Sequence, residues 1–173
     1  MIPPIFRYIL VFLLVIYSAF VHYNGSFGVA IYTYFAAALV LLTTLFTGTV
    51  FKASNEINNG DFDQAEKTLN KTYFPNLLLK RNKANFHFMK GMVELHKKNF
   101  EQGDNHLKKS LEIGLKTPTN KALAYLNLAH SSFLKGDFTQ CRTYLDIGKA
   151  LDANLHVLKK IEEMENALTG IMN

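Results

Sequence analysis

A phenylalanine recurs three times in the polar part of this 173-residue chain, at a constant spacing of 38 residues. Phe62, Phe100 and Phe138 follow the dipeptides Gly-Asp, Lys-Asn and Gly-Asp. Each is followed by a small residue three positions later and a leucine seven positions later, as on one helix face. A second amphipathic stretch precedes each of these turns. A helix, a tight turn and a helix, repeated, predict an all-α solenoid.

The pattern also predicts helix positions. Leading helices are expected at 50–57, 84–95 and 122–134, and a final helix at 155–168 that covers the open end of the stack. One motif disagrees, because Leu-x-Ile-Gly at 111–114 and 145–148 repeats after 34 residues. We keep 38, since 34 would misplace the aromatic turns.

The N-terminal part has a different composition. No Lys, Arg, Asp or Glu occurs from Tyr8 to Phe51, whereas the chain from Lys52 onward carries 18 basic and 14 acidic residues. Two apolar runs, about 5–21 and 27–51, flank a short turn containing Asn-Gly. The first is near the minimum length for a bilayer crossing and the second exceeds it. We therefore expect a transmembrane helical hairpin at 1–51 and a helical repeat domain at 52–173.

Charge predicts the orientation of this hairpin. Arg7 lies at the outer end of the first run, and Lys52, Lys67 and Lys71 follow the second, so the positive-inside rule puts both termini and the repeat domain in the cytoplasm. The chain would be a multi-pass integral membrane protein. A cleaved signal peptide is the alternative for the first run, although its charged region and cleavage site are poor. Cleavage would leave the repeat domain cytoplasmic.

Residue types predict the faces of the hairpin. Small residues suit the helix interface: Ser18, Ala19, Ala36, Ala37, Ala38, Thr44 and Gly48. Aromatic residues near the turn suit a membrane interface: Tyr17, Phe20, Tyr23, Phe27, Tyr32 and Tyr34. Because 49–59 lacks proline and glycine, the second span is expected to continue into the first repeat as one helix, from about Gly28 to Asn58.

Residues 122–154 resemble the tetratricopeptide repeat (TPR) family. The resemblance rests on these matches to its two helices and turn: Tyr125, Leu128, Ala129, Gly136, Asp137, Phe138, Cys141, Leu145 and Gly148. Residues 84–115 are similar more weakly, since His87 and Lys90 replace an aromatic residue and a leucine. The resemblance covers 49–154. The four residues beyond the family's usual 34 should lengthen the helices or the connections at 74–83 and 114–120.

The resemblance implies a groove that binds protein partners and is lined by the first helix of each repeat. Carried over position by position, it is lined by Phe88, Met89, Met92, Leu126, Asn127 and His130. Apart from Asn127, this set lacks the side chains with which the family's best-known pocket clamps a carboxylate. The three apolar residues of 88–92 either form an adaptable contact or pack in the core.

Basic residues concentrate between 76 and 121, a segment that contains ten basic and four acidic residues. The predicted basic surface comprises Lys80, Arg81, Lys83, Lys97, Lys98, Lys108 and Lys109. It is either a solvated helical face or a contact for anionic lipid or an acidic partner. The whole chain has three arginines and no nucleic-acid recognition motif, so no nucleic-acid partner is expected.

No motif for catalysis, metal binding or a cofactor is present. The chain has six histidines and one cysteine, without the spacing of a metal site. Asp61 and Asp137 are expected to cap helices. We therefore expect no enzyme, no metal and no cofactor, but a membrane-anchored scaffold or adaptor for protein partners. The alternative is a small structural or assembly subunit of a larger membrane complex, with contacts made mainly by the hairpin.

Overall fold

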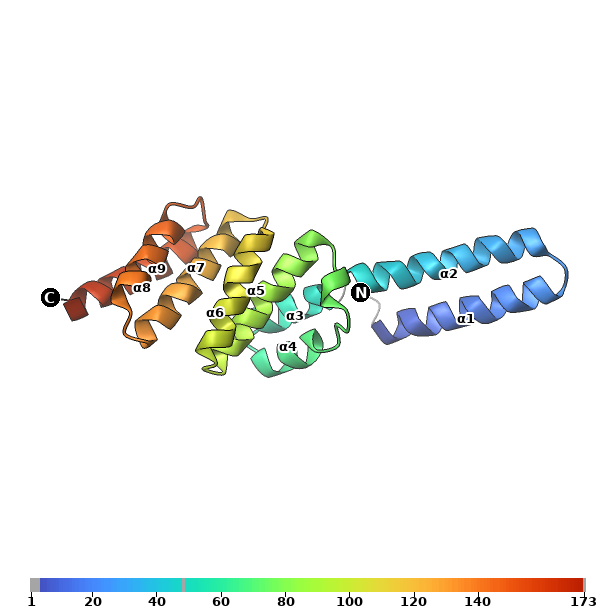
Figure 1. The fold of residues 1–173 in the computed structure, drawn as a ribbon, viewed down its shortest axis with the longest axis horizontal. Helices are drawn as coiled ribbons and strands as arrows, with labels where there is room; N and C mark the ends of the chain where they lie inside the picture. Colours follow the sequence, from blue (N-terminus) through green and yellow to red (C-terminus); the bar gives the residue numbers. More distant parts are fainter. Residues whose placement is uncertain (1–3, 48, 173) are drawn as a thin grey trace.

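The computed structural model describes residues 4–47 and 49–172, which form helices without any strand. A two-helix hairpin projects from one end of a stack of paired helices (Figure 1). The predicted all-α class is thus confirmed. The elements are α1 (Pro4–Tyr23), α2 (Phe27–Thr47), α3 (Val50–Asn58), α4 (Phe62–Leu69), the 3-10 turn η1 (Pro75–Leu77), α5 (Lys80–His96), α6 (Phe100–Ile113), α7 (Pro118–Leu134), α8 (Phe138–Lys149) and α9 (Leu155–Met172).

The three polar turns share one backbone geometry. The residue two before each helix start, Gly60, Lys98 or Gly136, has a positive φ of 81°, 63° or 80°. The following amide donates to the carbonyl five residues earlier, at 2.9 Å in all three turns. This is a Schellman helix ending. It confirms the 38-residue period.

The rival 34-residue motif has no common structure. Gly114 ends α6 with a φ of 105°. Gly148 lies inside α8, where an added Cβ would come 3.2 Å from Ile161 Cδ1. The four extra residues of each repeat lengthen the leading helices, because α5 and α7 begin at Lys80 and Pro118, four residues before the expected starts.

Two of the three turns end in a side-chain cap, as predicted. Asp61 Oδ1 accepts a hydrogen bond from Gln64 N at 3.0 Å, and Asp137 Oδ1 accepts one from Gln140 N at 2.9 Å. These bonds satisfy amides that have no partner within the helix. Asn99 does not cap α6, and its Nδ2 instead donates to Glu94 Oε2 at 2.9 Å.

Lys98→Gly is expected to raise the free energy of unfolding by about 0.5–1 kcal/mol, because a lysine in the left-handed region is strained and glycine is not. Lys98 is the one non-glycine residue with positive φ in the described part of the chain. Denaturant titration of the full-length protein in detergent measures the change. Lys108→Gly, inside α6, should lower stability by about 1 kcal/mol. A loss at Lys98 as well would contradict the strain argument.

Glycine allows α5 and α6 to cross closely. A Cβ added at Gly91 would lie 2.7 Å from Leu107 Cγ and 3.0 Å from Gly103 O. A Cβ added at Gly103 would lie 2.5 Å from Leu95 Cδ2. The equivalent small residues of the other pairs, Ala65, Ala129 and Cys141, are fully buried. The prediction that small residues mark the helix crossings is confirmed.

The pairs stack in chain order. Leading helices α3, α5, α7 and α9 contact one another in sequence, and each second helix contacts the next leading helix. Helix α9 covers the open end, as predicted, and buries Val157, Ile161 and Leu168 against Cys141 and Leu145.

Ion pairs join successive repeats at equivalent positions. Lys97 Nζ lies 2.9 Å from Glu66 Oε1, and Lys135 makes the same pair with Asp104, both residues being shifted by 38. The two lysine side chains are about 40% exposed (42% and 40%), so each pair contributes on the order of 0–1 kcal/mol. Their recurrence supports the stacking register independently of the aromatic turns.

Helices α1 and α2 run antiparallel and pack on each other through small residues (Figure 1). Ser18, Ala30 and Ala37 are buried, and Ser18 Oγ lies 2.7 Å from Thr33 Oγ1. Ser18 and Ala37 were predicted here and Ala30 was not.

Of the other small residues predicted at the interface of α1 and α2, those whose side chains the structure describes are not fully buried there. Ala36 is half-buried, whereas Ala19 and Ala38 are exposed and were predicted wrongly, because consecutive helical residues point in different directions. The side chain of Thr44, and Gly48 entirely, lie outside the described residues. Among the described residues, no helix combines the length and apolar character needed to cross a membrane.

The expected single helix from Gly28 to Asn58 is wrong. Helix α2 ends at Thr47, and Thr49 precedes α3 with φ −102° and ψ 9°. Gly48 lies outside the described residues. A physical reason is that α3 packs on α4 and α5, whereas α2 packs on α1, and glycine at 48 weakens helix continuation by about 1 kcal/mol. Thr49 Oγ1 also lies 2.7 Å from Thr72 Oγ1, which ties the junction to the end of the first pair.

Candidate functional site

The six predicted groove residues lie on α5 and α7 but differ in exposure. Phe88 and Met89 are 8% and 3% exposed and belong to the main core cluster. Met92 and Leu126 are half-buried against the two core clusters. The core interpretation therefore applies to Phe88 and Met89, which offer almost no surface to a partner.

The polar members of the predicted groove are more accessible. Asn127 is half-buried, and its Nδ2 donates to Leu123 O of its own helix at 2.7 Å. His130 is exposed. Of the six residues, His130 alone is exposed, so it is the best position from which to probe partner contact.

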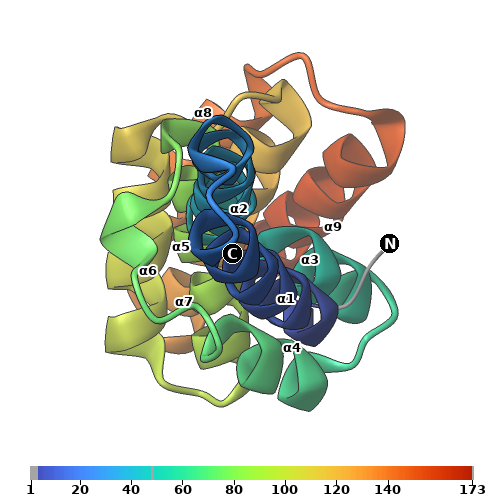
Figure 2. The same cartoon turned by 90° about the vertical axis from the view of Figure 1, so that its right-hand side faces the viewer.

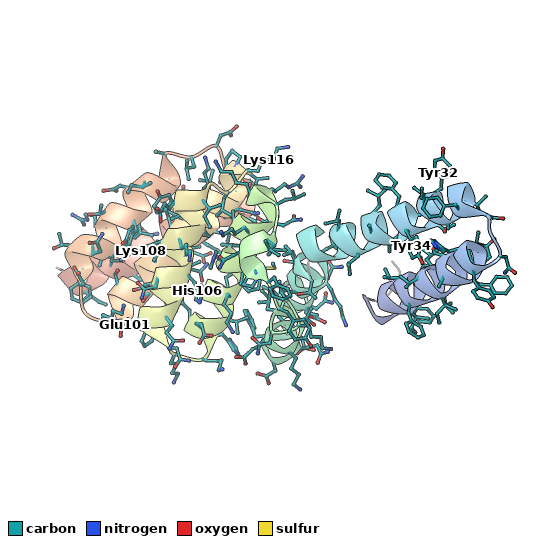
Figure 3. The ribbon with its side chains drawn as sticks, turned by 45° about the vertical axis from the view of Figure 1, so that its right-hand side comes forward. Tyr32, Tyr34, Glu101, His106, Lys108 and Lys116 are labelled. Atoms are coloured by element: carbon teal, nitrogen blue, oxygen red, sulfur yellow. The ribbon has the colours of Figure 1, made fainter. Side chains whose placement is uncertain are left out.

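A histidine pair that the sequence did not suggest joins α5 to α6. His87 Nδ1 lies 2.9 Å from His106 Nδ1, and the ring centroids are 5.2 Å apart. Figure 3 shows His106 on α6 between Glu101 and Lys116. The glycine crossing could have revealed the pair, because His87 lies one turn before Gly91 and His106 about one turn after Gly103.

The histidine pair favours uncharged rings. Burial, followed by Lys109, His106 and Lys83, lowers the pKa of His87 from 6.5 to about 4. Burial and Lys90 also lower the pKa of His106, against an opposing effect of Glu94. Two facing Nδ1 atoms need one proton between them, so one neutral ring donates and the other accepts.

Stability should fall as the pH drops from 6.5 toward 4. The folded-state pKa values lie below the unfolded value, so the unfolded chain binds more protons in this window. The shift at His87 corresponds to at most about 3 kcal/mol. Melting temperatures of the full-length protein in detergent, between pH 7 and 4.5, measure this slope. The double variant His87→Phe/His106→Leu should flatten it, and His130→Gln should leave it unchanged. An unaltered slope in the double variant would assign the effect to other groups.

A polar network also joins the first two pairs. Lys90 lies 3.4 Å from Glu94, 3.8 Å from Glu66 and 3.2 Å from Asn70 Oδ1. Burial raises the pKa of Glu94, but the hydrogen bond from Asn99 and the nearby lysines outweigh it and lower the pKa. These groups satisfy one another, which suits a role in packing better than one in binding.

The seven residues of the predicted basic surface do not form one patch. Lys80, Arg81 and Lys83 lie in the first turn of α5, whereas Lys97 and Lys98 follow its other end. A helix of 17 residues separates the two groups by about 25 Å. Lys108 and Lys109 lie on α6, where Figure 3 shows Lys108 between the helix ends. The group at the start of α5 is therefore a separate basic cluster.

Other candidate sites carry little chemistry. A cavity of about 390 Å³ lies between α8 and α9, away from the predicted groove, with Arg142, Asp146 and Glu165 in its wall. Glu165 is already paired with Lys149 at 2.6 Å. Among the described residues, no three His, Cys, Asp or Glu side chains are placed to hold a metal ion.

Most of the exposed large apolar side chains in the described part of the chain lie on the hairpin. Its predicted aromatic belt is exposed, from 40% at Tyr34 to 90% at Tyr23, and Figure 3 shows Tyr32 and Tyr34 toward the free end. Further exposed apolar residues follow on both helices: Phe6, Ile9, Leu10, Phe12, Leu13, Val15, Ile16, Val29, Ile31, Phe35, Leu39, Leu41 and Leu42.

Comparison with known proteins gives no further assignment. No family model matches the chain, and no curated protein matches it at a significant level.

Proposed function

We propose that the chain is a membrane-anchored helical-repeat scaffold, in which α1 and α2 form a transmembrane hairpin and α3–α9 recruit protein partners. The observation that carries the proposal is the contrast between the two parts. The repeat domain encloses two apolar core clusters of its own, whereas the hairpin exposes apolar side chains along both helices.

A bilayer is the environment that best fits the hairpin surface. So large an exposed apolar area is unusual on a protein in water and typical of a membrane or protein contact. Helices of 20 and 21 residues measure about 30 Å, which matches the hydrocarbon thickness. Among the described residues, no helix qualifies as a membrane span. Some side chains of both helices lie outside these residues, among them those of 43–47. The sequence of 43–47, Thr-Thr-Leu-Phe-Thr, also lacks charge.

The orientation proposed for this anchor keeps both termini and the repeat domain in the cytoplasm. The turn between α1 and α2 has no lysine or arginine, whereas basic residues follow α2. The aromatic residues near the turn would then occupy the opposite membrane interface. Ser18 and Thr33 provide a hydrogen bond between the helices, which suits packing in lipid.

The resemblance to the TPR family supports protein partners as the ligands. The order of contacts, leading helix on leading helix, presents α3, α5 and α7 along one side of the stack. His130 on α7 is the exposed member of the six predicted groove residues. Because Phe88 and Met89 are buried, a partner would bind through the more polar predicted groove residues on α7, Asn127 and His130.

A subunit of a larger membrane complex is the second candidate, because the exposed hairpin surface also suits packing against other transmembrane helices. Photocrosslinking separates the two functions. A photoreactive amino acid is placed at His130 or at Phe12 in the full-length chain, and adducts are identified after mild-detergent purification. Protein adducts at His130 support the scaffold. Adducts confined to Phe12 would replace it with the subunit role.

A further inference from the structure

The connection between α4 and α5 exposes an unusual number of large apolar side chains. Tyr73, Phe74, Leu77 and Leu79 are 77%, 57%, 50% and 57% exposed. In the equivalent connection between α6 and α7, the large apolar residue Leu115 is buried at 3%. Solvent exposure is therefore not a general property of the connections in this fold.

This connection is held in a defined shape. Its central residue Leu78 is 5% exposed and belongs to the main core cluster. The 3-10 turn η1 is closed by a hydrogen bond from Leu77 N to Phe74 O at 3.0 Å. Leu78 thus anchors the segment, while its neighbours Leu77 and Leu79 remain outside.

The exposed connection lies at the base of the hairpin. Thr72, directly before Tyr73, has its Oγ1 2.7 Å from Oγ1 of Thr49, the residue between the hairpin and α3. Figure 2 views the molecule from the hairpin end, and the α4–α5 connection lies on the face of the stack turned toward the hairpin. Figure 1 shows the same connection at that end of the stack.

Positively charged residues flank the apolar residues in the sequence. Lys71 precedes them, Lys80 and Arg81 follow, and all three are exposed, with Lys83 half-buried one turn further on. No Asp or Glu occurs between Glu66 and Glu94. We name this set the junction surface: Lys71, Tyr73, Phe74, Leu77, Leu79, Lys80, Arg81 and Lys83.

We propose that the junction surface docks onto the anionic headgroups of the membrane that holds the hairpin. The proposal rests on the transmembrane anchor proposed above and adds a second, peripheral contact. Aromatic and leucine side chains suit the boundary between headgroups and acyl chains, and lysine and arginine suit lipid phosphates. Because the hairpin keeps the domain beside the bilayer, even a weak contact is populated. Docking fixes the orientation of the repeat stack above the membrane.

Lipid-quenching in nanodiscs that hold one chain each tests this surface. An environment-sensitive dye is attached to Phe74→Cys in a Cys141→Ala background, and headgroup-nitroxide lipids serve as quenchers. In bilayers containing phosphatidylserine we expect strong quenching at position 74. The same dye at Leu155→Cys, an apolar site on α9 that is 69% exposed against 57% at Phe74, should be quenched several-fold less. Equal quenching at both positions, or none at 74, would overturn the proposal.

Charge variants test the role of the basic residues. Lys80→Glu/Arg81→Glu should reduce quenching at position 74 at least twofold in anionic nanodiscs. Lys159→Glu/Lys160→Glu, a matched exposed pair on α9, should leave it unchanged. Equal effects of the two double variants on quenching would show that Lys80 and Arg81 have no specific role in docking. Quenching at position 74 that is as strong in purely zwitterionic lipid as in anionic lipid would show the same.

Failure here is distinguishable from failure of the anchor. The same labelled variants are also reconstituted into liposomes, and their flotation on a density gradient at alkaline pH reports hairpin insertion alone. Flotation without quenching at 74 leaves the anchor standing and rejects the docking surface. If quenching appears only when several chains share one nanodisc, the surface binds a second copy and the lipid proposal is wrong.

Discussion

Gly91→Val is expected to destabilise the repeat domain by at least about 3 kcal/mol, a large share of the stability of a domain this size. The added Cβ alone would lie 2.7 Å from Leu107 Cγ and 3.0 Å from the backbone oxygen of Gly103. A backbone contact is not relieved by a new rotamer, so α5 and α6 must move apart. The loss should lower the melting temperature by more than about 10 °C, as measured by circular dichroism.

The matched control for this substitution is Gly170→Ala on α9, where an added Cβ meets nothing within 4 Å. This change should be neutral or raise stability by up to about 1 kcal/mol, because alanine favours the helix. If Gly91→Val melted within a few degrees of the unmodified protein, the close crossing of α5 and α6 would be incorrect.

On the proposed transmembrane anchor, the double variant Phe12→Asp/Leu39→Asp is expected to lose most of its membrane integration. Both side chains are exposed near the middle of their helices, 65% and 47%. In a bilayer they face hydrocarbon, where each Asp costs about 3 kcal/mol on insertion scales. The fraction resistant to alkaline extraction should therefore fall several-fold in membranes from expressing cells.

The control for the hairpin variant is Leu134→Asp, which changes an apolar side chain of 53% exposure on the repeat domain. It should leave extraction unaltered. If the hairpin instead lay in water, charges at Phe12 and Leu39 would be harmless, so full retention of integration by the double variant would argue against lipid around these helices.

The sequence pattern was sufficient for the repeat architecture. The spacing of the three phenylalanines located the starts of α4, α6 and α8, because turn geometry and capping are decided by a few neighbouring residues. Small residues at the crossings could be assigned because helical periodicity places them on the same face as the leucines. The extra turn at the start of α5 and α7 was located only by the structure.

Features that depend on contacts between distant residues could not be predicted. The break between α2 and α3 is accompanied by packing of α3 on α5 and by the hydrogen bond between the hydroxyl groups of Thr49 and Thr72, which are remote in sequence. The pairing of His87 with His106 was not predicted for the same reason, because it joins residues on two different helices. The exposure of Tyr73 and Phe74 was also missed, because an apolar run such as Leu77–Leu79 gives no sign of which residue enters the core.

The proposed anchor places the hairpin across a membrane and the repeats on its cytoplasmic side. The most direct test is cysteine labelling with a membrane-impermeant maleimide, in intact cells and in a Cys141→Ala background. A cysteine at Ser26, in the turn between α1 and α2, should be labelled. A cysteine at Glu163, exposed on α9, should react only after the cells are permeabilised. In intact cells, labelling of the cysteine at position 163 but not of the one at position 26 would contradict the proposed orientation. Protection of both cysteines until permeabilisation would also contradict it.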